Sequence, residues 1–468
     1  MRISRRRFIH ASGIYAAMTA GEITYMKGRI PRAPETNTGR MKTASRSSVL
    51  WRCTVPVRYE CDVAVVGGGI SGVAAALAAA RSGARVILVE RFAVTGGNAT
   101  SGGVGSFCGE TRGQGEAFDA IIEGLDAFHA IAPYRPYEEK GSRVFDPEIL
   151  AVVLQEKLLE RGVKLLLHTQ FVDARVRNGH ITECVVSGPS GPEALRARHF
   201  IDCTGEAQLA VRTGFETVKG RPEDGLQLPM SLMFYVRHVA PEEAHPQVPE
   251  GWFEALLTEE DLPMTSIWPD GPRSNAVKIK IPMYDASDTE SLTAAEIRAR
   301  RRMMEVLDYY QRREAKPWVL SRCSPRIGIR EGRRIVGMYT LTVEDLRSGR
   351  AFDDGIARGV FYLDGHKPDD DKRTYILPRD QLRVPPYHVP FRCLIPKGSK
   401  NLLAAGRCLS ADQLALSSAR VMTTCAMMGQ AAGIAAALGA SRRCHLSQID
   451  PLEVRRTVEE RGANLALG

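Results

Sequence analysis

The sequence predicts an α/β fold in which a parallel sheet continues into a β-meander, with an inserted α+β domain. Residues 61–90 pass from a β-branched run through glycines and an alanine-rich helix to a second β-branched run, the pattern of a βαβ unit. Residues 163–203 then predict a strand, a hairpin and another strand. The less regular stretch at 226–385 mixes strand-like runs with an arginine-rich helix and predicts the inserted domain.

The βαβ unit carries the glycine pattern of a dinucleotide-binding turn. After an apolar strand, Gly67, Gly69 and Gly72 form G-x-G-x-x-G. The first glycine permits a tight turn, the second lets the backbone approach a pyrophosphate, and the third lets helix and strand pack closely. The helix stops at Gly83, and the next strand ends at Glu90, where a carboxylate can accept hydrogen bonds from an adenosine ribose.

The segments that follow favour FAD over NAD. Residues 91–109 are rich in glycine and offer backbone amides to a phosphate or a flavin ring, whereas NAD domains usually continue with another helix and strand. A helix and a hairpin at Asn178-Gly179 come next, and the strand after them ends at Thr204-Gly205. This order resembles that of the two-dinucleotide-fold flavoproteins, of which glutathione reductase and fumarate reductase are examples.

The closing piece of such a domain comes late in the chain. A short apolar strand at 401–405 is followed by Gly406, which opens a loop that contains Asp412. Ser417 or Ser418 is predicted to cap a long helix of small residues and methionines. The positive end of that helix can face the pyrimidine edge of a flavin.

Several motifs carry a resemblance to a known family over about residues 59–440. The chain resembles FAD-dependent oxidoreductases related to the flavin subunit of heterodisulfide reductase and, more distantly, fumarate reductase and thiazole-synthase flavoproteins. The motifs are VVGGGISGVAAALAAARSGARVILVE, TGGNATSGGV, IDCTGEAQLA, RIGIREGRRIVGMYTLTVEDLRSGR, VPFRCLIP and NLLAAGRCLSADQLALSSARVMTTCAMMGQAAG. The resemblance implies FAD, with its adenosine half at the first glycine turn and its ring near residues 97–99. The residues assigned to the cofactor are Gly67, Gly69, Gly72, Glu90, Arg91, Gly97, Asn98, Ala99, Thr204, Gly205, Gly406, Asp412 and Arg420.

Cysteine spacing gives no sign of a metal centre. The ten cysteines include no C-x-x-C pair, so the sequence has no local ligand set for zinc or an iron–sulfur cluster, and no metal is expected. Most of these cysteines are expected to be small buried hydrophobic residues. A disulfide is left open.

Flavin chemistry on a small molecule also needs groups that bind the substrate and move a proton. The candidates are Arg330, His366 and His388, with Arg392 as a further cation. Histidine suits proton transfer near neutral pH, and arginine suits an anionic substrate or a carbonyl.

Each candidate also has a structural alternative. The motif around the first arginine contains Glu331 and Arg334, which can form a structural ion pair. His366 lies on a predicted loop beside Asp364, which can orient its imidazole. His388 lies among prolines in a stiff extended segment, which suits a catalytic group or a surface residue.

The distribution of charge argues against nucleic-acid binding. The net charge of +9 lies entirely in residues 1–60, which hold 12 Lys or Arg and 3 acidic residues, whereas residues 61–468 hold 51 of each sign. The apolar runs are too short to predict a membrane-spanning segment.

The N-terminal segment SRRRFIHASGIYAAMTA resembles the twin-arginine export signal, so we expect an exported or periplasmic protein. A basic tail on a cytoplasmic protein is the alternative. The predicted organisation is a signal at 1–20, a flexible linker at 21–58, the first part of the FAD-binding domain at 59–225, a substrate or cap domain at 226–385, the closing part of the FAD-binding domain at 386–445 and a C-terminal helix at 446–468.

The leading functional prediction is an FAD-dependent dehydrogenase or reductase that transfers a hydride between flavin N5 and a small organic substrate. The alternatives are an electron-transfer subunit that works with a redox protein and a protein in which FAD has a structural or sensing role. No second dinucleotide fingerprint occurs, so a nicotinamide partner is not expected, and the sequence leaves the electron acceptor open.

Overall fold

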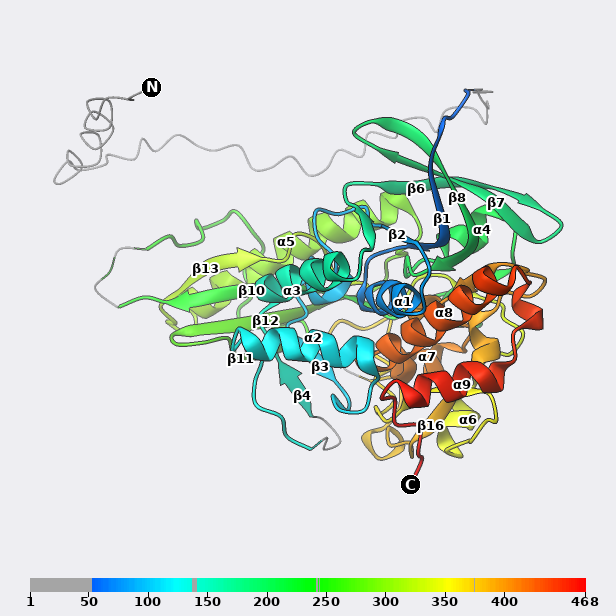
Figure 1. The fold of residues 1–468 in the computed structure, drawn as a ribbon. Helices are drawn as coiled ribbons and strands as arrows, with labels where there is room; N and C mark the ends of the chain where they lie inside the picture. The colour runs from blue at the N-terminus through cyan, green and yellow to red at the C-terminus, as the bar shows by residue number, and fades with distance from the viewer. Residues whose placement is uncertain (1–52, 137–140, 241–242, 244, 374) are drawn as a thin grey trace. The chain divides into compact units, whose positions relative to one another are not determined.

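The computed structural model describes residues 53–136, 141–240, 243, 245–373 and 375–468, all within one compact unit (Figure 1). The predicted export signal and nearly all of the predicted linker lie outside the described residues. The first strand, β1 (Val57–Val66), begins before the predicted start at residue 61, so the linker ends earlier than predicted. No single helix among the described residues is long and apolar enough to cross a membrane.

A mostly parallel sheet forms the centre of the described fold. Its strand order is β5-β2-β1-β8-β7-β6, and β17 pairs with β8 beside this path. Strands β5, β2, β1, β8 and β17 are parallel, whereas β8, β7 and β6 form an antiparallel meander, so the predicted sheet is confirmed. The strands are β1 (Val57–Val66), β2 (Val86–Val89), β5 (Lys164–Leu166), β6 (Gln170–Arg177), β7 (His180–Gly188), β8 (Gly191–Asp202) and β17 (Leu402–Ala404).

Strand β8 joins the two parts of this sheet because it changes partner along its length. Its first half pairs with β7, with Arg196 opposite Glu183, and its last residues pair with β17. The turn between β6 and β7 has Asn178 and Gly179 at positive φ, as the hairpin motif predicts. Strand β8 is therefore shared by the antiparallel meander and the parallel part of the sheet.

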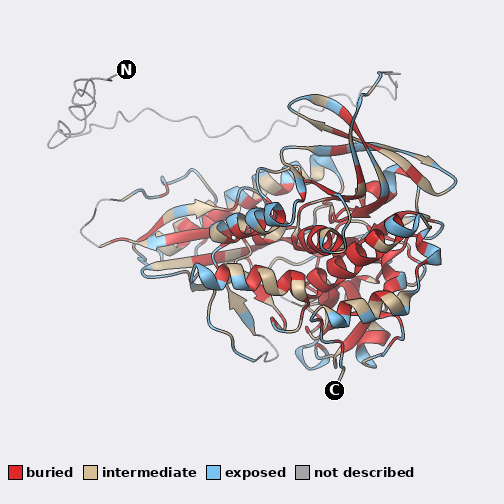
Figure 2. Cartoon of the chain, in the orientation of Figure 1, coloured by how far each residue is buried: buried red, intermediate tan, exposed pale blue. Residues whose placement is uncertain are grey.

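Two buried helices, α1 and α8, pack against each other and against β1 and β8 (Figure 2). A Cβ at Gly429 would overlap the carbonyl oxygen of Ser71, and one at Gly433 would overlap that of Ala75, so these glycines allow the close approach. The helices are α1 (Ile70–Arg81), α2 (Glu116–Ala127), α3 (Pro147–Glu160), α4 (Gln208–Arg212), α5 (Thr289–Arg312), α6 (Val343–Arg347), α7 (Gln413–Ala419), α8 (Met422–Arg442) and α9 (Pro451–Glu460).

The long helix predicted near the C-terminus is two helices. Helices α7 and α8 meet at an angle of 91°. Ser417 and Ser418 lie inside α7, so their predicted role as N-cap of the long helix is wrong. Asp412 is the N-cap of α7, and α8 begins at Met422 without a side-chain cap. After the bend, Met422 and Cys425 in the first turn of α8 line a cavity.

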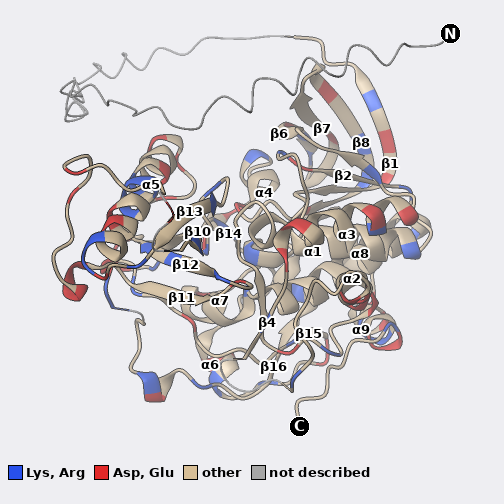
Figure 3. Cartoon of the chain, turned by 90° about the vertical axis from the view of Figure 1, so that its left-hand side faces the viewer, with Lys and Arg blue, Asp and Glu red and all other residues tan. Residues whose placement is uncertain are grey.

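A second, antiparallel sheet packs against the long helix α5 and encloses its own apolar core. Basic and acidic residues both occur along α5 (Figure 3). These elements lie inside the predicted cap domain at 226–385, whose boundaries stay a prediction. The strand order is β11-β12-β10-β13, with bounds β10 (Met230–His238), β11 (Thr265–Pro269), β12 (Ser274–Ile281) and β13 (Trp318–Cys323).

Short strand pairs and the C-terminal segment complete the unit. All ten cysteines lie in the described part of the chain, and none of them forms a disulfide. The predicted C-terminal helix at 446–468 is shorter than expected, because α9 occupies only Pro451–Glu460. The pairs are β3 (Ser106–Cys108) with β4 (Ser142–Val144), β9 (Thr217–Val218) with β14 (Arg334–Ile335), and β15 (Gly355–Gly359) with β16 (Tyr387–Pro390).

Candidate active site

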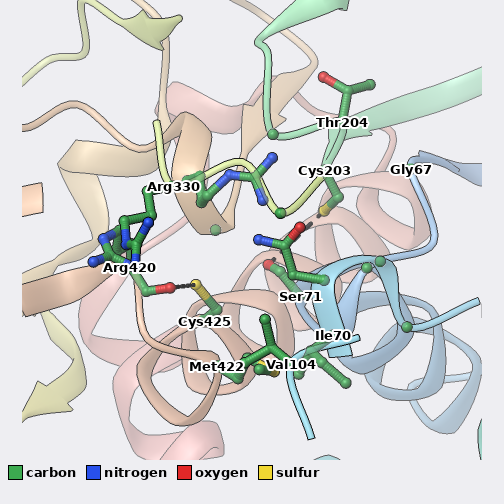
Figure 4. Close-up of a pocket in the computed structure, with 18 of the residues that line it drawn as sticks. Gly67, Ile70, Ser71, Val104, Cys203, Thr204, Arg330, Arg420, Met422 and Cys425 are labelled. Carbon is green, nitrogen blue, oxygen red and sulfur yellow. Dashed lines mark hydrogen bonds between the residues drawn. The ribbon is translucent and has the colours of Figure 1, made fainter. Parts of the chain in front are cut away.

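A cavity lies at the carboxyl edge of the parallel sheet. The residues that follow β1, β2, β8 and β17 line it, and ligands of open α/β sheets bind at this edge. Figure 4 shows the guanidinium groups of Arg330 and Arg420 on one side of the cavity and the turn at Gly67 on the other. The predicted cofactor residues that line the cavity are Gly67, Gly69, Glu90, Arg91, Gly97, Asn98, Thr204, Gly205, Gly406 and Arg420.

The glycine turn after β1 forms a cradle of backbone amides. Gly67 has φ 100°, and a Cβ there would overlap the carbonyl group of Cys203. A Cβ at Gly72 would overlap the carbonyl oxygen of Gly67, so this glycine serves the packing of α1 on β1. At Gly69 a Cβ would meet no atom within 4 Å, and this residue begins α1 without a side-chain cap. The free amides of a helix N-terminus beside open space suit a phosphate.

Glu90 shapes the same turn from the end of β2. Its carboxylate accepts hydrogen bonds from the backbone N–H of Gly68 at 2.7 Å and of Phe92 at 2.9 Å. A carboxylate has further lone pairs, so Glu90 can still accept a bond from a ribose hydroxyl in the cavity that it lines.

Three arginines, Arg91, Arg326 and Arg407, lie near this turn, and they outnumber the carboxylates beside them. Burial and, after it, repulsion by Arg407 and Arg91 lower the pKa of Arg326 to about 10. Their acidic neighbours are Glu90 and Glu206. The carboxylate of Glu206 is 3.5 Å from Nη2 of Arg407 and accepts no hydrogen bond from a described residue. Burial raises the pKa of Glu206 to about 7. The arginine cluster therefore suits an added anion such as a diphosphate.

A second charged cluster lies where the second sheet closes the cavity. Asp364 accepts a hydrogen bond from Nη2 of Arg420 at 2.9 Å. Nε2 of His366 is 3.1 Å from Oδ1 of Asp364, so the predicted contact between these two residues is present. Arg330 lines the cavity and donates to the carbonyl oxygen of Pro229 at 2.7 Å.

Electrostatics keep the members of this cluster in defined protonation states. Burial and, after it, the charge of Arg330 lower the pKa of His366 to about 3, so the imidazole is neutral near pH 7. Burial opposes ionisation of Asp364, but His366, Arg420 and Arg330 together hold the pKa of Asp364 below its ordinary value. The cluster thus presents an ionised carboxylate and a neutral imidazole.

A family model described as FAD dependent oxidoreductase matches residues 62–458. The chain belongs to this family. Among curated proteins, thiamine thiazole synthase of Pyrococcus horikoshii is 30% identical over 178 residues, 36% of this chain and 66% of that protein. The thiamine thiazole synthase of Pyrococcus abyssi is 31% identical over 163 residues, 32% of this chain and 60% of that protein. The chain therefore spans less than two thirds of the length of these relatives.

Solved structures show more distant likenesses. An aromatic hydroxylase from angucycline biosynthesis has a TM-score of 0.47 and 16% identity, over 86% of this chain and 68% of that chain. A geranylgeranyl bacteriochlorophyll reductase-like protein from Thermoplasma acidophilum has a TM-score of 0.45 and 12% identity, over 87% of this chain and 93% of that chain. The predicted relation to heterodisulfide reductase stays a prediction.

The cavity fits the FAD of this family of oxidoreductases. The amide cradle at Gly69 and the arginine cluster suit the diphosphate, and Glu90 lies where a ribose would be bound. Arg420 and Met422 line the other end, at the uncapped first turn of α8. An uncapped helix N-terminus favours the negative charge of a reduced flavin, as the sequence predicts for this helix.

Three predicted cofactor residues act in packing and capping instead of lining the cavity. Gly72 allows the contact between α1 and β1, and Ala99 is fully buried in the turn after Gly97. The Asp412 carboxylate accepts from the backbone N–H groups of Ala415 and Val343, so its hydrogen bonds serve the start of α7.

The four predicted catalytic residues have different outcomes. Arg330 lines the cavity. His366 does not line it but contacts Asp364, which does. His388 does not line the cavity; it is buried in β16 with Nε2 2.7 Å from the carbonyl oxygen of Leu465. Arg392 does not line the cavity either; it forms an ion pair with Asp354 at 2.9 Å on another part of the surface.

The sequence analysis missed several charged residues of the cavity. Arg326 and Arg407 belong to motifs that the analysis singled out, but neither was assigned a role. Lys278 was missed as well, because β12 alternates lysine with isoleucine, which is the pattern of an ordinary half-exposed strand. The predicted ion pair of Glu331 and Arg334 is present and buried.

Proposed function

We propose that this FAD-dependent enzyme transfers a hydride between its flavin and a small organic molecule held beside Arg330 and Asp364. The observation that carries the proposal is the extent of the cavity, which continues beyond the predicted cofactor residues to the second sheet. There Ser231 and Met233 of β10 and Trp268 of β11 line it. A flavin subunit that only exchanges electrons with a protein has no need of such an enclosed space.

The bound FAD would supply the hydride-accepting or hydride-donating ring. The protein would supply orientation and a route for the proton. Arg330 is fixed by the Pro229 carbonyl and by Oγ of Ser231 at 2.6 Å, so its remaining donors are available to a substrate oxygen. Asp364 would hold the neutral His366 through Nε2, which leaves Nδ1, without a hydrogen-bond partner among the described residues, to accept a proton.

The test is anaerobic addition of hydroxy acids, sugars and carbonyl compounds to the purified holoprotein, with the flavin absorbance as readout. We expect at least one small molecule to bleach or to reoxidise the flavin. Reduction only by a reduced redox protein would instead support an electron-transfer subunit, and no reaction with either would support a structural or sensing role. Arg330→Gln and His366→Gln should each retain FAD and lose most of the small-molecule reaction.

A further inference from the structure

The side chain of Lys278 lines the cavity and has no hydrogen-bond or ion-pair partner among the described residues. It lies on β12, two residues before Lys280, whose Nζ donates to the carbonyl oxygen of Arg373 at 2.6 Å. Lys278 forms no hydrogen bond or ion pair with any residue of the described part of the chain, although it is half-buried and lines the cavity. A half-buried charge without a partner is costly, and this one faces the space in which a ligand can lie.

The neighbours of Lys278 leave the positive charge uncompensated. Arg330 donates only to neutral oxygens, those of Pro229 and Ser231. Arg420 is paired with Asp364, the one carboxylate that lines this end of the cavity among the described residues. Three cations thus face a single carboxylate.

The pKa values show the same imbalance. Burial and, after it, the charge of Arg420 lower the pKa of Arg330 to about 10. Burial also lowers the pKa of Lys278, and the charge of Arg330 adds to that shift. Repulsion among cations that the protein does not neutralise is relieved by an anionic ligand.

This cluster is separate from the arginines that suit the cofactor diphosphate. Arg91, Arg326 and Arg407 influence one another near the glycine turn, whereas Lys278 and Arg330 influence each other at the second sheet. Apolar surface adjoins the second cluster, since Met233 and Trp268 line the same part of the cavity. The site therefore combines a cationic end with an apolar wall.

We propose that this end of the cavity binds a substrate with a carboxylate group, whose charge Lys278 and Arg330 match, and an apolar body that lies against Met233 and Trp268. The assignment of this ligand as substrate rests on the proposed function. The binding of a carboxylate at this place does not depend on turnover.

The test compares carboxylates with their neutral amides on the holoprotein. Benzoate and benzamide, and acetate and acetamide, are titrated while the flavin absorbance and the melting temperature are recorded. We expect benzoate to perturb the flavin spectrum and benzamide to bind at least about tenfold more weakly. Lys278→Met and Arg330→Gln should each weaken benzoate about tenfold or more. Arg237→Gln removes one positive charge from an exposed position on β10 and should leave benzoate binding unchanged.

The outcomes separate this proposal from the proposed function. Equal binding of benzoate and benzamide to the wild-type holoprotein would overturn the carboxylate site, whatever the variants do. Reduction of the flavin by neutral molecules alone would also overturn it while leaving hydride transfer intact. Selective benzoate binding, lost in the Lys278 variant, in a protein whose flavin no small molecule reduces would support the anion site and contradict the proposed function.

Discussion

Asp364 and Arg420 form an ion pair on the cavity wall, with Oδ2 of the aspartate 2.9 Å from Nη2 of the arginine. Arg420 also donates to the backbone carbonyl of Asp364 at 3.2 Å. Both side chains are largely buried, at 16% and 12% exposure. The contact joins the loop after β15 to the bend between α7 and α8, so the pair stabilises the bend that points the first turn of α8 at the cavity.

A double-mutant cycle should show strong coupling between these two residues. Asp364→Asn or Arg420→Gln leaves one buried charge without a partner, which costs about 3 kcal/mol of unfolding free energy. The double variant removes both charges and should cost clearly less than the sum of the single variants. Urea unfolding of the apoproteins measures all three, and additive costs would show that the pair does not stabilise the bend.

The two glycines Gly69 and Gly72 should separate cofactor binding from folding. A methyl group at Gly69 meets no protein atom within 4 Å, so Gly69→Ala should fold normally and bind FAD at least about tenfold more weakly, because the methyl group lies at the phosphate cradle. In the matched variant Gly72→Ala, the new Cβ overlaps the carbonyl oxygen of Gly67. This variant should lose both stability and FAD. Thermal unfolding of the apoprotein and titration with FAD measure the two effects. Wild-type FAD affinity in Gly69→Ala would place the diphosphate elsewhere.

These glycines also show what could be predicted from the sequence. The turn at Gly67 and Gly69 is encoded within a few residues, and its pattern indicates both the backbone shape and the ligand. The long-helix prediction failed at Ser417 and Ser418 because the chain bends after them, where Arg420 contacts Asp364, a residue far away in the sequence. Local capping signals cannot report such a contact.

Prediction of the catalytic end found Arg330 but missed other residues of the cavity for the same reason. Lys278 comes from a strand of the second sheet and Asp364 from a loop, and only the fold brings them to one cavity. The stiff segment around His388 suggested a catalytic role, but the partner of its imidazole is the backbone of Leu465 near the C-terminus. Short motifs identified the cofactor site because its residues are close in the sequence, whereas the substrate end is built from distant segments.

His388→Ala should therefore affect stability and leave the reaction unchanged. The variant removes the hydrogen bond to Leu465 and the contact to the backbone of Phe352, whose N–H donates to Nδ1 at 3.1 Å. We expect a loss of about 1–2 kcal/mol of unfolding free energy, with faster hydrogen exchange in the C-terminal segment. FAD content and flavin reduction should match the wild type. A loss of reduction at unchanged stability would restore the catalytic assignment.

His199 should make the protein sensitive to acid. It lies on β8 at 3% exposure, where a Cβ at Gly439 of α8 would be 2.6 Å from its Nε2. Burial and, to a smaller extent, the neighbouring His180 and His445 lower the pKa of His199 from 6.5 to about 4. The folded protein therefore holds this imidazole neutral, whereas the unfolded chain binds a proton at the ordinary pKa.

The sign of the effect follows from this difference between the two states. The contribution of His199 to stability is fully present above about pH 6.5 and is lost as the pH falls toward 4, because protonation then favours the unfolded chain. Between pH 7 and pH 4.5 the loss amounts to roughly 2–3 kcal/mol of unfolding free energy. His199→Leu should lose that much less than the wild type over the same interval, since the other titrating groups are common to both proteins. The exposed His168 gives the matched control, and His168→Leu should keep the full wild-type loss. Equal acid sensitivity in all three proteins would mean that folding does not lower the pKa of His199.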